Sequence, residues 1–384
     1  MNVLTTFVDP AKLLTRPVRV KSLVLASVLT LYVIATFVIF FKEVVPSFED
    51  LSTDETFAVD TTTYTDLADS VREGRYTPYV VGSLANFPNT TWTPFLVWLV
   101  LNSAFLVMLM NYALFVFSIL LLRKTFSFSL AVFMPLLLLN PTTTTSLLCL
   151  NKEIFDLFYL SLFLYSRVKK KKWILLITLV FALLNRYELC LVMLLFVVAG
   201  SRWNPLRERR IATLVLLVLA LNFAIPFWGR EMLAQRFEEA ASANTIAVLD
   251  RLQMNYLYVL AVIPKIAENL FGQLANPQVW KATTAWLIVN LFNNISYAIV
   301  LSVAAVKRRL TLRNDLIYFA AFGAVLAAQS LAVQPRYFQF IYVLLCLQIA
   351  QLKPESWVGR ASITKHGSRR SYASRPIGKE AALG

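Results

Sequence analysis

Long apolar runs separated by short basic clusters constrain this chain more than any other feature of its sequence. Of its 384 residues, 58% are hydrophobic, and several runs approach the roughly 20 residues that a helix needs to cross a bilayer. Runs of this length without charges are typical of transmembrane helices. The sequence therefore predicts an all-α, polytopic membrane bundle of about ten transmembrane segments.

The charge distribution favours a membrane protein over a nucleic-acid-binding protein. The formal net charge is +15, but the lysines and arginines stand in short clusters between apolar runs, which is the pattern that sets membrane topology. The three cysteines fall inside apolar runs and the single histidine, His366, lies in the C-terminal tail. Neither a disulfide framework nor a His/Cys metal site is indicated, and no nucleic-acid partner is expected.

Basic residues place the N-terminus in the cytoplasm. Arg16, Arg19 and Lys21 precede the first apolar run, residues 22–41, which we interpret as a retained anchor. The loop 42–92 that follows holds nine acidic and three basic residues. An acidic loop of this kind is expected on the extracytoplasmic side.

The apolar run 173–200 contains two charges, Arg186 and Glu188. As one helix it would place the flanking clusters RVKKKK and SRWNPLRERR on opposite sides of the membrane, against the positive-inside rule. A hairpin keeps both clusters inside. Each arm is then roughly two-thirds of a span, so Arg186 and Glu188 form a tip at or below the outer surface. Earlier in the chain, Pro141 is expected to end a helix over 126–139.

The C-terminal half continues the same alternation of apolar and basic segments. Residues 229–281 are mixed in polarity and predict an extracytoplasmic amphipathic segment along the membrane interface. The basic tail 353–384 is expected to be cytoplasmic and disordered. The remainder, residues 1–352, forms a single polytopic membrane domain.

Under this topology, ionisable residues from separate segments gather on the outer side. Each costs about 2.5–3.5 kcal/mol at membrane depth and normally faces a protein interior or a wet cavity. A site therefore explains them better than chance does, although Lys152 and Asp156 are four residues apart and could simply neutralise each other. The group comprises Lys152, Glu153, Asp156, Arg186, Glu188 and Arg336.

Three stretches resemble known enzymes. The loop VDTTTYTDLADSVREGRYTP resembles the first outward loop of GT-C type membrane glycosyltransferases, and QPRYFQFIYVLL is similar to the Arg-Tyr that opens a late helix in them. The stretch from NKEIF to NRYE resembles the middle of bacterial polysaccharide polymerases of the Wzy and EpsG kind. The chain departs from them in having Lys152-Glu153 where EpsG-like chains have Arg-Gln, and in lacking the Arg-rich loops of O-antigen polymerases.

By this resemblance, the protein transfers a sugar from a polyprenyl phosphate or diphosphate carrier to a hydroxyl on the outer side of the membrane. Such a reaction needs a carboxylate for the acceptor proton and cations for the phosphate leaving group. Asp60 is the first candidate for the base, followed by Asp66 and Glu153. The candidate substrate-binding residues are Arg186 and Arg336, whose guanidinium groups suit phosphate, with Lys152, Arg72, Arg75, Glu188 and Tyr64, a residue that could equally be an interfacial anchor.

The resemblance requires no cofactor, and no metal-ligand set is visible in the sequence. Water-mediated Mg²⁺ or Mn²⁺ binding by the carboxylates stays an alternative. The expected partners are a polyprenyl-linked saccharide, the lipid bilayer and other polysaccharide-assembly proteins, and the expected location is a bacterial inner membrane. A flippase or transporter of lipid-linked sugars, and a non-catalytic subunit of an envelope polysaccharide complex, are the alternative functions.

Overall fold

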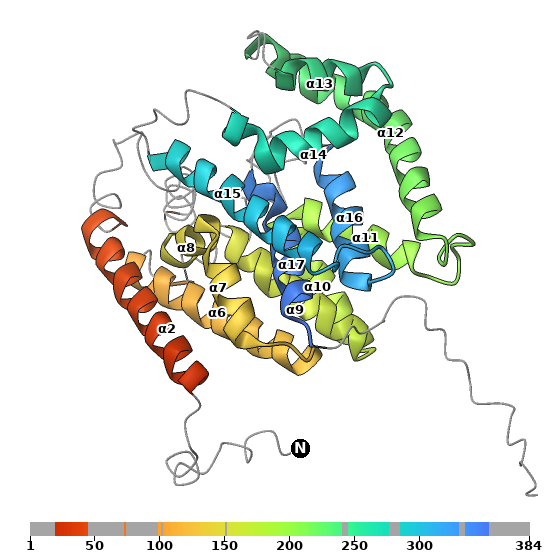
Figure 1. Cartoon of the computed structure of the whole chain (residues 1–384). Coiled ribbons are helices and arrows are strands. Elements are labelled where there is room, and N and C mark those ends of the chain that lie inside the picture. Colours follow the sequence, from red (N-terminus) through yellow and green to blue (C-terminus); the bar gives the residue numbers. More distant parts are fainter. Residues whose placement is uncertain are drawn as a thin grey trace, which may run out of the picture.

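The computed structural model describes residues 20–44, 73, 99–100, 103–149, 152–239, 245–275, 285–329 and 335–352. Every named element in this part of the chain is helical, and its only extended pairing is a single bridge between Phe128 and Gln351. The helices form one bundle, with α13 and α14 at one end of it (Figure 1). In chain order they are α2 (Val20–Ile39), the π-helix η1 (Phe40–Val44), α6 (Ala104–Thr125), α7 (Leu130–Leu138), α8 (Pro141–Leu148), α9 (Lys152–Val168), α10 (Lys172–Asn185), α11 (Tyr187–Ala199), α12 (Arg210–Glu239), α13 (Thr245–Met254), α14 (Tyr258–Ala275), α15 (Ala285–Val306), α16 (Asp315–Ala327), the 3-10 helix η3 (Pro335–Phe338) and α17 (Gln339–Ala350).

Three of the described helices are long and apolar enough to cross a membrane: Val24–Lys42, Ala104–Thr125 and Ile288–Val306. The pair α7 and α8 would make a fourth span, bent by 80° at its break. Five further apolar helices are shorter. The chain is therefore all-helical in its described part and has helices long and apolar enough to span a membrane, whereas the ten predicted spans are not shown.

Two helix ends bear on the sequence expectations. The helix expected over 126–139 ends at Leu138, as predicted, but Pro141 and the threonines after it belong to the next helix, α8, where the missing N–H of proline costs nothing at the first helical position. Gly229 does not begin a separate amphipathic segment, because α12 continues through it to Glu239. The helix α13 then begins at Thr245.

The turns after α6, α9, α11 and α15 lie together at what we call the basic end of the bundle. Lys124 lies over the ring of Tyr165, 5.8 Å from its centroid, which joins the ends of α6 and α9. The Leu352 N–H donates to the Ser127 carbonyl at 3.0 Å, which adds the end of α17. Arg210 donates to the Leu312 carbonyl at 2.7 Å and pairs with Asp315. The basic residues gathered here are Arg123, Lys124, Arg167, Lys169, Lys170, Lys171, Lys172, Arg202, Arg207, Arg209, Arg210, Lys307, Arg308, Arg309 and Arg313.

Two of the turns at the basic end hold a non-glycine residue in the left-handed region. Lys170 has a φ of 56° and Arg308 a φ of 51°. In each, the next residue's N–H donates to a carbonyl five residues back, Lys171 to Ser166 and Arg309 to Ala304, both at 2.8 Å. This is the Schellman helix end, where glycine is usual. In both turns, the residue in this conformation is a basic residue of the basic end where a glycine would be more favourable.

Aromatic side chains fill the core between the short helices. The Phe196 ring on α11 lies 4.4 Å from that of Phe319 on α16, and Phe163 on α9 lies 5.2 Å from Phe319. Where α16 meets α17, Gly323 leaves room for the Phe340 ring. A Cβ at Gly323 would overlap Cε2 and Cζ of that ring, so close packing of these two helices depends on the glycine.

We predict that Gly323→Ala lowers the free energy of unfolding by about 1–3 kcal/mol, because a buried ring must move to admit the new methyl group. Thermal unfolding of the detergent-solubilised protein measures this as a fall in Tm. Gly272→Ala is the matched control, because there the new Cβ meets only the end of the flexible Glu268 side chain. Equal Tm values for the two variants would contradict this account of the α16–α17 contact.

Candidate functional site

A buried ionic cluster joins α9 to the junction of α10 and α11. Glu153 and Asp156 are three residues apart at the start of α9 and share one face of that helix. Arg186 Nη1 donates to Asp156 Oδ2 and lies 3.6 Å from Glu153 Oε1. Glu153 and Asp156 are each 3% exposed, and Arg186 is 7% exposed. The cluster therefore places charges from α9 and from the α10–α11 junction in contact with one another, away from solvent.

The break between α10 and α11 is what delivers Arg186 to the carboxylates. Its backbone is extended, with φ −154° and ψ 90°, so it ends one helix and begins the next. Cys190 Sγ lies 3.4 Å from the Leu179 carbonyl oxygen, a contact that requires α11 to fold back along α10. The two helices thus form the hairpin expected from the basic clusters on either side.

A third segment closes over the arginine. The Tyr337 ring of η3 faces the Arg186 guanidinium, with 5.3 Å between Cζ and the ring centroid. An aromatic face favours a nearby cation, most of all when water is excluded. Residues far apart in the sequence, on α9, at the α10–α11 junction and on η3, therefore share one cluster.

The cluster lies well inside the end of the long helix α6. Phe117 packs against Phe158 at 5.8 Å, and Lys124 lies over Tyr165, so α6 and α9 run parallel in a fixed register. In this register Glu153 is level with Tyr112. At 1.5 Å per residue, that is about 12 Å inside the first residue of α6. The charges consequently stand within the length of this candidate span, on the side away from the basic end.

Glu153 has a carboxylate oxygen that takes no part in the contacts with Arg186. Glu153 Oε2 is buried and has no hydrogen-bond partner among the described residues. Buried polar atoms of this kind are uncommon, and each calls for an explanation in terms of strain, catalysis or an absent ligand. Glu153 therefore presents an acceptor that a substrate hydroxyl could use.

The predicted site residues divide into three groups. Glu153 and Arg186 are brought together, and Glu188 is exposed on the next turn, where it still interacts electrostatically with Arg186. Lys152 begins α9 and Arg336 lies in η3, but the side chains of both residues are outside the described part. The remaining predicted residues, Asp60, Asp66, Tyr64, Arg72 and Arg75, also lie outside it.

The structure gives Asp156 a specific role and adds one residue that the sequence did not place in a site. Asp156, expected in the group of outer charges but without a task of its own, pairs with Arg186, and Tyr337 stacks on Arg186. Asp156 had a visible signal, a charge at helical spacing from Glu153. Tyr337 had only its position beside Arg336. The Arg186 guanidinium, predicted to bind phosphate, is here engaged by carboxylates, and the phosphate role stays a prediction.

A seam of neutral polar side chains lies at the break between α7 and α8. Asn293 Oδ1 accepts hydrogen bonds from the Thr142 N–H and hydroxyl, at 3.2 and 2.9 Å. Asn140 Nδ2 donates to Ser296 at 3.1 Å, and Gln339 Nε2 donates to Thr143 at 2.8 Å. These bonds satisfy the backbone and hydroxyl groups that an 80° bend exposes inside the bundle. Sequence reasoning missed this seam.

A second buried ion pair lies between α13 and α14, which are not among the apolar helices. Lys265 Nζ is 2.8 Å from Asp250 Oδ1, and the lysine side chain is fully buried. Burial raises the pKa of the Asp250 carboxyl, and the Lys265 ammonium opposes that shift. Burial likewise lowers the pKa of Lys265. The pair fastens α13 onto α14.

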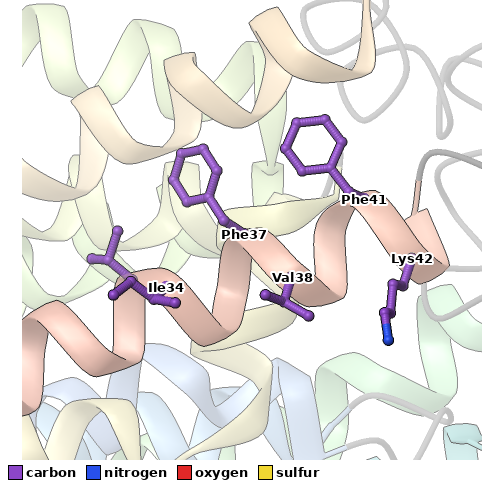
Figure 2. Close-up of a pocket in the computed structure, with 6 residues that line it drawn as sticks. Ile34, Phe37, Val38, Phe41 and Lys42 are labelled. Atoms are coloured by element: carbon purple, nitrogen blue, oxygen red, sulfur yellow. The ribbon is translucent and has the colours of Figure 1, made fainter.

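An apolar groove runs along α2. Its lining is Val33, Ile34, Phe37, Val38 and Phe41, with Lys42 at one end, and its volume is about 420 Å³ (Figure 2). The groove is open to the surroundings of the bundle and suits an acyl or prenyl chain. Among the described residues, no group of three or more His, Cys, Asp or Glu side chains could hold a metal ion.

Comparison of the chain with protein-family models, with curated proteins and with solved structures finds no match.

We predict different stability effects for the two carboxylates of the cluster. Asp156→Asn removes the direct partner of a buried cation and is expected to cost about 3 kcal/mol of unfolding free energy. Glu153→Gln leaves the Arg186–Asp156 pair intact and is expected to change stability by less than about 1 kcal/mol. Tm values in one detergent compare the two. If Glu153→Gln is as damaging as Asp156→Asn, the two carboxylates hold the arginine equally.

Proposed function

We propose that the protein is a membrane glycosyltransferase that uses a polyprenyl-phosphate- or diphosphate-linked sugar in the synthesis of a cell-surface polysaccharide. The observation that supports this most is the buried cluster of Glu153, Asp156 and Arg186 at membrane depth. Ionisable residues at such depth usually mark a functional site. The GT-C-like architecture and the polymerase activity follow from the sequence resemblance and belong to this proposal.

The positions of the charges orient the reaction. Under the positive-inside rule the basic end faces the cytoplasm, so the cluster opens toward the outer side of a bacterial inner membrane. A lipid-linked sugar flipped to that side meets the cluster without leaving the bilayer. Its prenyl chain fits the apolar groove on α2, with Lys42 near the phosphate.

The charged residues have separate roles in the proposed glycosyl transfer. The acceptor hydroxyl oxygen attacks the anomeric carbon, the bond from that carbon to the phosphate oxygen breaks, and polyprenyl phosphate or diphosphate leaves. The hydroxyl proton passes to Glu153, whose Oε2 lacks another partner in the described structure. Arg186 fixes the position of Glu153, and Lys152 and Arg336 are the cations closest in sequence for the leaving phosphate. Asp60 and Asp66 remain candidate bases from the outer loop.

The broken pair α7 and α8 favours a second candidate, a flippase or transporter of lipid-linked sugars. Interrupted helices with polar groups at the break are typical of transporter binding sites. Here the break is bent by 80° and surrounded by Asn, Thr and Gln side chains. The same cations would then accompany the diphosphate across the membrane.

We predict that Glu153→Gln lowers polysaccharide synthesis by at least about a hundredfold without loss of the folded protein, because general base catalysis contributes on that order. Surface glycan from a deletion strain carrying wild type or variant is resolved by length. Glu208→Gln, an exposed acid at the basic end, is the matched control.

The location of the precursor separates the candidates. Lipid-linked precursor accumulating on the outer side, with shortened glycan, supports the transferase. Precursor confined to the inner side indicates the flippase. Normal glycan from Glu153→Gln alone moves the role of base to the outer loop, and normal glycan from Glu153→Gln, Asp60→Asn and Asp66→Asn alike indicates a non-catalytic subunit.

The orientation of the bundle in the membrane can be tested by cysteine labelling. We predict that a cysteine introduced as Tyr187→Cys is labelled by a membrane-impermeant maleimide in intact cells, whereas Arg313→Cys is labelled only after permeabilisation. The three native cysteines are buried, so their background should be low. The reverse pattern would place the basic end outside and remove the argument for an extracytoplasmic site.

A further inference from the structure

The basic end contains buried polar groups that lack partners. Arg167, in the last turn of α9, has a buried Nε without a hydrogen-bond partner among the described residues. The same is true of Gln348 Oε1 and of both amide atoms of Gln351 in the described part of the chain. Each glutamine is only 2% exposed. Such groups cost free energy unless a ligand or water completes them.

Helix packing places these three residues in one layer. Gly323 on α16 meets Phe340 on α17, and the two helices run antiparallel from there, so Phe319 is level with the middle of α17. Phe319 also packs against Phe163 on α9. Because α9 and α17 both run toward the basic end, Arg167 is level with Gln348.

Gln351 lies at the edge of this layer that is nearest the turns of the basic end. It follows the last residue of α17 and pairs with Phe128 in the isolated bridge, beside the hydrogen bond from Leu352 to Ser127. The end of α6 is next to α9 here, as the contact of Lys124 with Tyr165 shows. The layer thus lies directly beneath the turns at the basic end.

The surrounding charge is almost entirely positive. Arg123, Lys124, Lys169, Lys170 and Lys171 are exposed on the adjacent turns. The two acids of the basic end are already engaged, since Glu208 pairs with Arg207 at 3.7 Å and Asp315 pairs with Arg210. Both described acids of this end therefore pair with other arginines, and Arg167 can bind a different anion.

We propose that Arg167, Gln348 and Gln351 form a binding site for a phosphate group at the cytoplasmic surface, separate from the buried cluster and independent of the function proposed above. A guanidinium Nε–H and an amide N–H₂ donate to phosphate oxygens. The amide oxygens accept hydrogen bonds from a hydroxyl or ammonium group carried by the same ligand. The headgroup of an anionic phospholipid such as phosphatidylglycerol supplies both, and free phosphate supplies the first.

The test uses the purified full chain in nanodiscs of phosphatidylcholine alone or of an equal mixture with phosphatidylglycerol, and in detergent with or without millimolar inorganic phosphate. Tm and the apparent affinity for added lipid are measured for wild type, Arg167→Met, Gln348→Met and Gln351→Met. Arg313→Met, an exposed cation at the same end, is the matched control. We expect phosphatidylglycerol to raise the Tm of wild type and control alike.

The glutamine variants make the test specific. Replacing an unpartnered buried amide by a side chain of similar shape should raise Tm in neutral lipid. Gln351→Met should weaken the response to phosphatidylglycerol at least about tenfold, as expected for the loss of one charge-assisted hydrogen bond from its amide N–H₂. Gln348→Met should weaken it less, because Gln348 Oε1 accepts only from a neutral hydroxyl of the headgroup. A purely structural role for these glutamines would not separate the two effects. Arg167→Met should also lose the response, and if it fails to fold, the glutamine variants still decide.

The outcomes identify the ligand or reject the site. A response to phosphatidylglycerol alone assigns a lipid headgroup, and an equal response to inorganic phosphate assigns a free phosphate. Equal weakening in Arg313→Met and the site variants would show only general attraction of a basic surface for anions and would overturn the proposal. So would the absence of any response in the wild type.

Discussion

The ion pair between Arg186 and Asp156 is the interaction on which the rest of the bundle depends. A charge at membrane depth is tolerated only when a protein partner replaces water, and removing either partner leaves the other uncompensated. This pair ties the α10–α11 hairpin to the start of α9, and Tyr337 adds the segment that leads into α17. Three stretches of the chain that are distant in sequence are thereby held at one point, and the short apolar helices pack around that point through their aromatic side chains.

Helix length explains how a cluster at this depth could be reached by the substrate proposed for it. The helices that carry or surround it have 12 to 17 residues, whereas α6 and α15 have 22 each. At 1.5 Å per residue, the short helices span about 18–26 Å and the long ones about 33 Å, against a hydrocarbon thickness of about 30 Å. All of these helices reach the basic end, so the short ones stop below the opposite surface. A polar headgroup can then meet charged side chains while its lipid chain stays in the bilayer.

The sequence predicted those parts of the structure that depend on local pattern. Apolar runs located the helices, and two charges in one run located the break at Arg186. The break at Asn140 was not predicted as a bend, because a proline after an apolar run marks a helix end and a helix start equally well. The seam of Asn293, Gln339 and the α8 threonines gave no signal, since isolated amides in apolar helices do not specify their partners. The number of spans stays a prediction, because pattern alone does not determine how deep a short apolar helix reaches.

The buried polar atoms that lack partners differ between the two ends of the bundle, and the difference bears on the role proposed for each end. At the buried cluster, one guanidinium faces two carboxylates and an aromatic ring, and Glu153 Oε2 is an acceptor left over. At the basic end, the unpartnered atoms of Arg167, Gln348 and Gln351 are a guanidinium N–H, an amide N–H₂ and two amide oxygens, and both described carboxylates are engaged by arginines. An unused acceptor suits a hydroxyl that must lose a proton, whereas an unused cation suits an anion that must only be held. The chemistry proposed for one end and the anchoring proposed for the other both rest on the same requirement that buried polar atoms find partners.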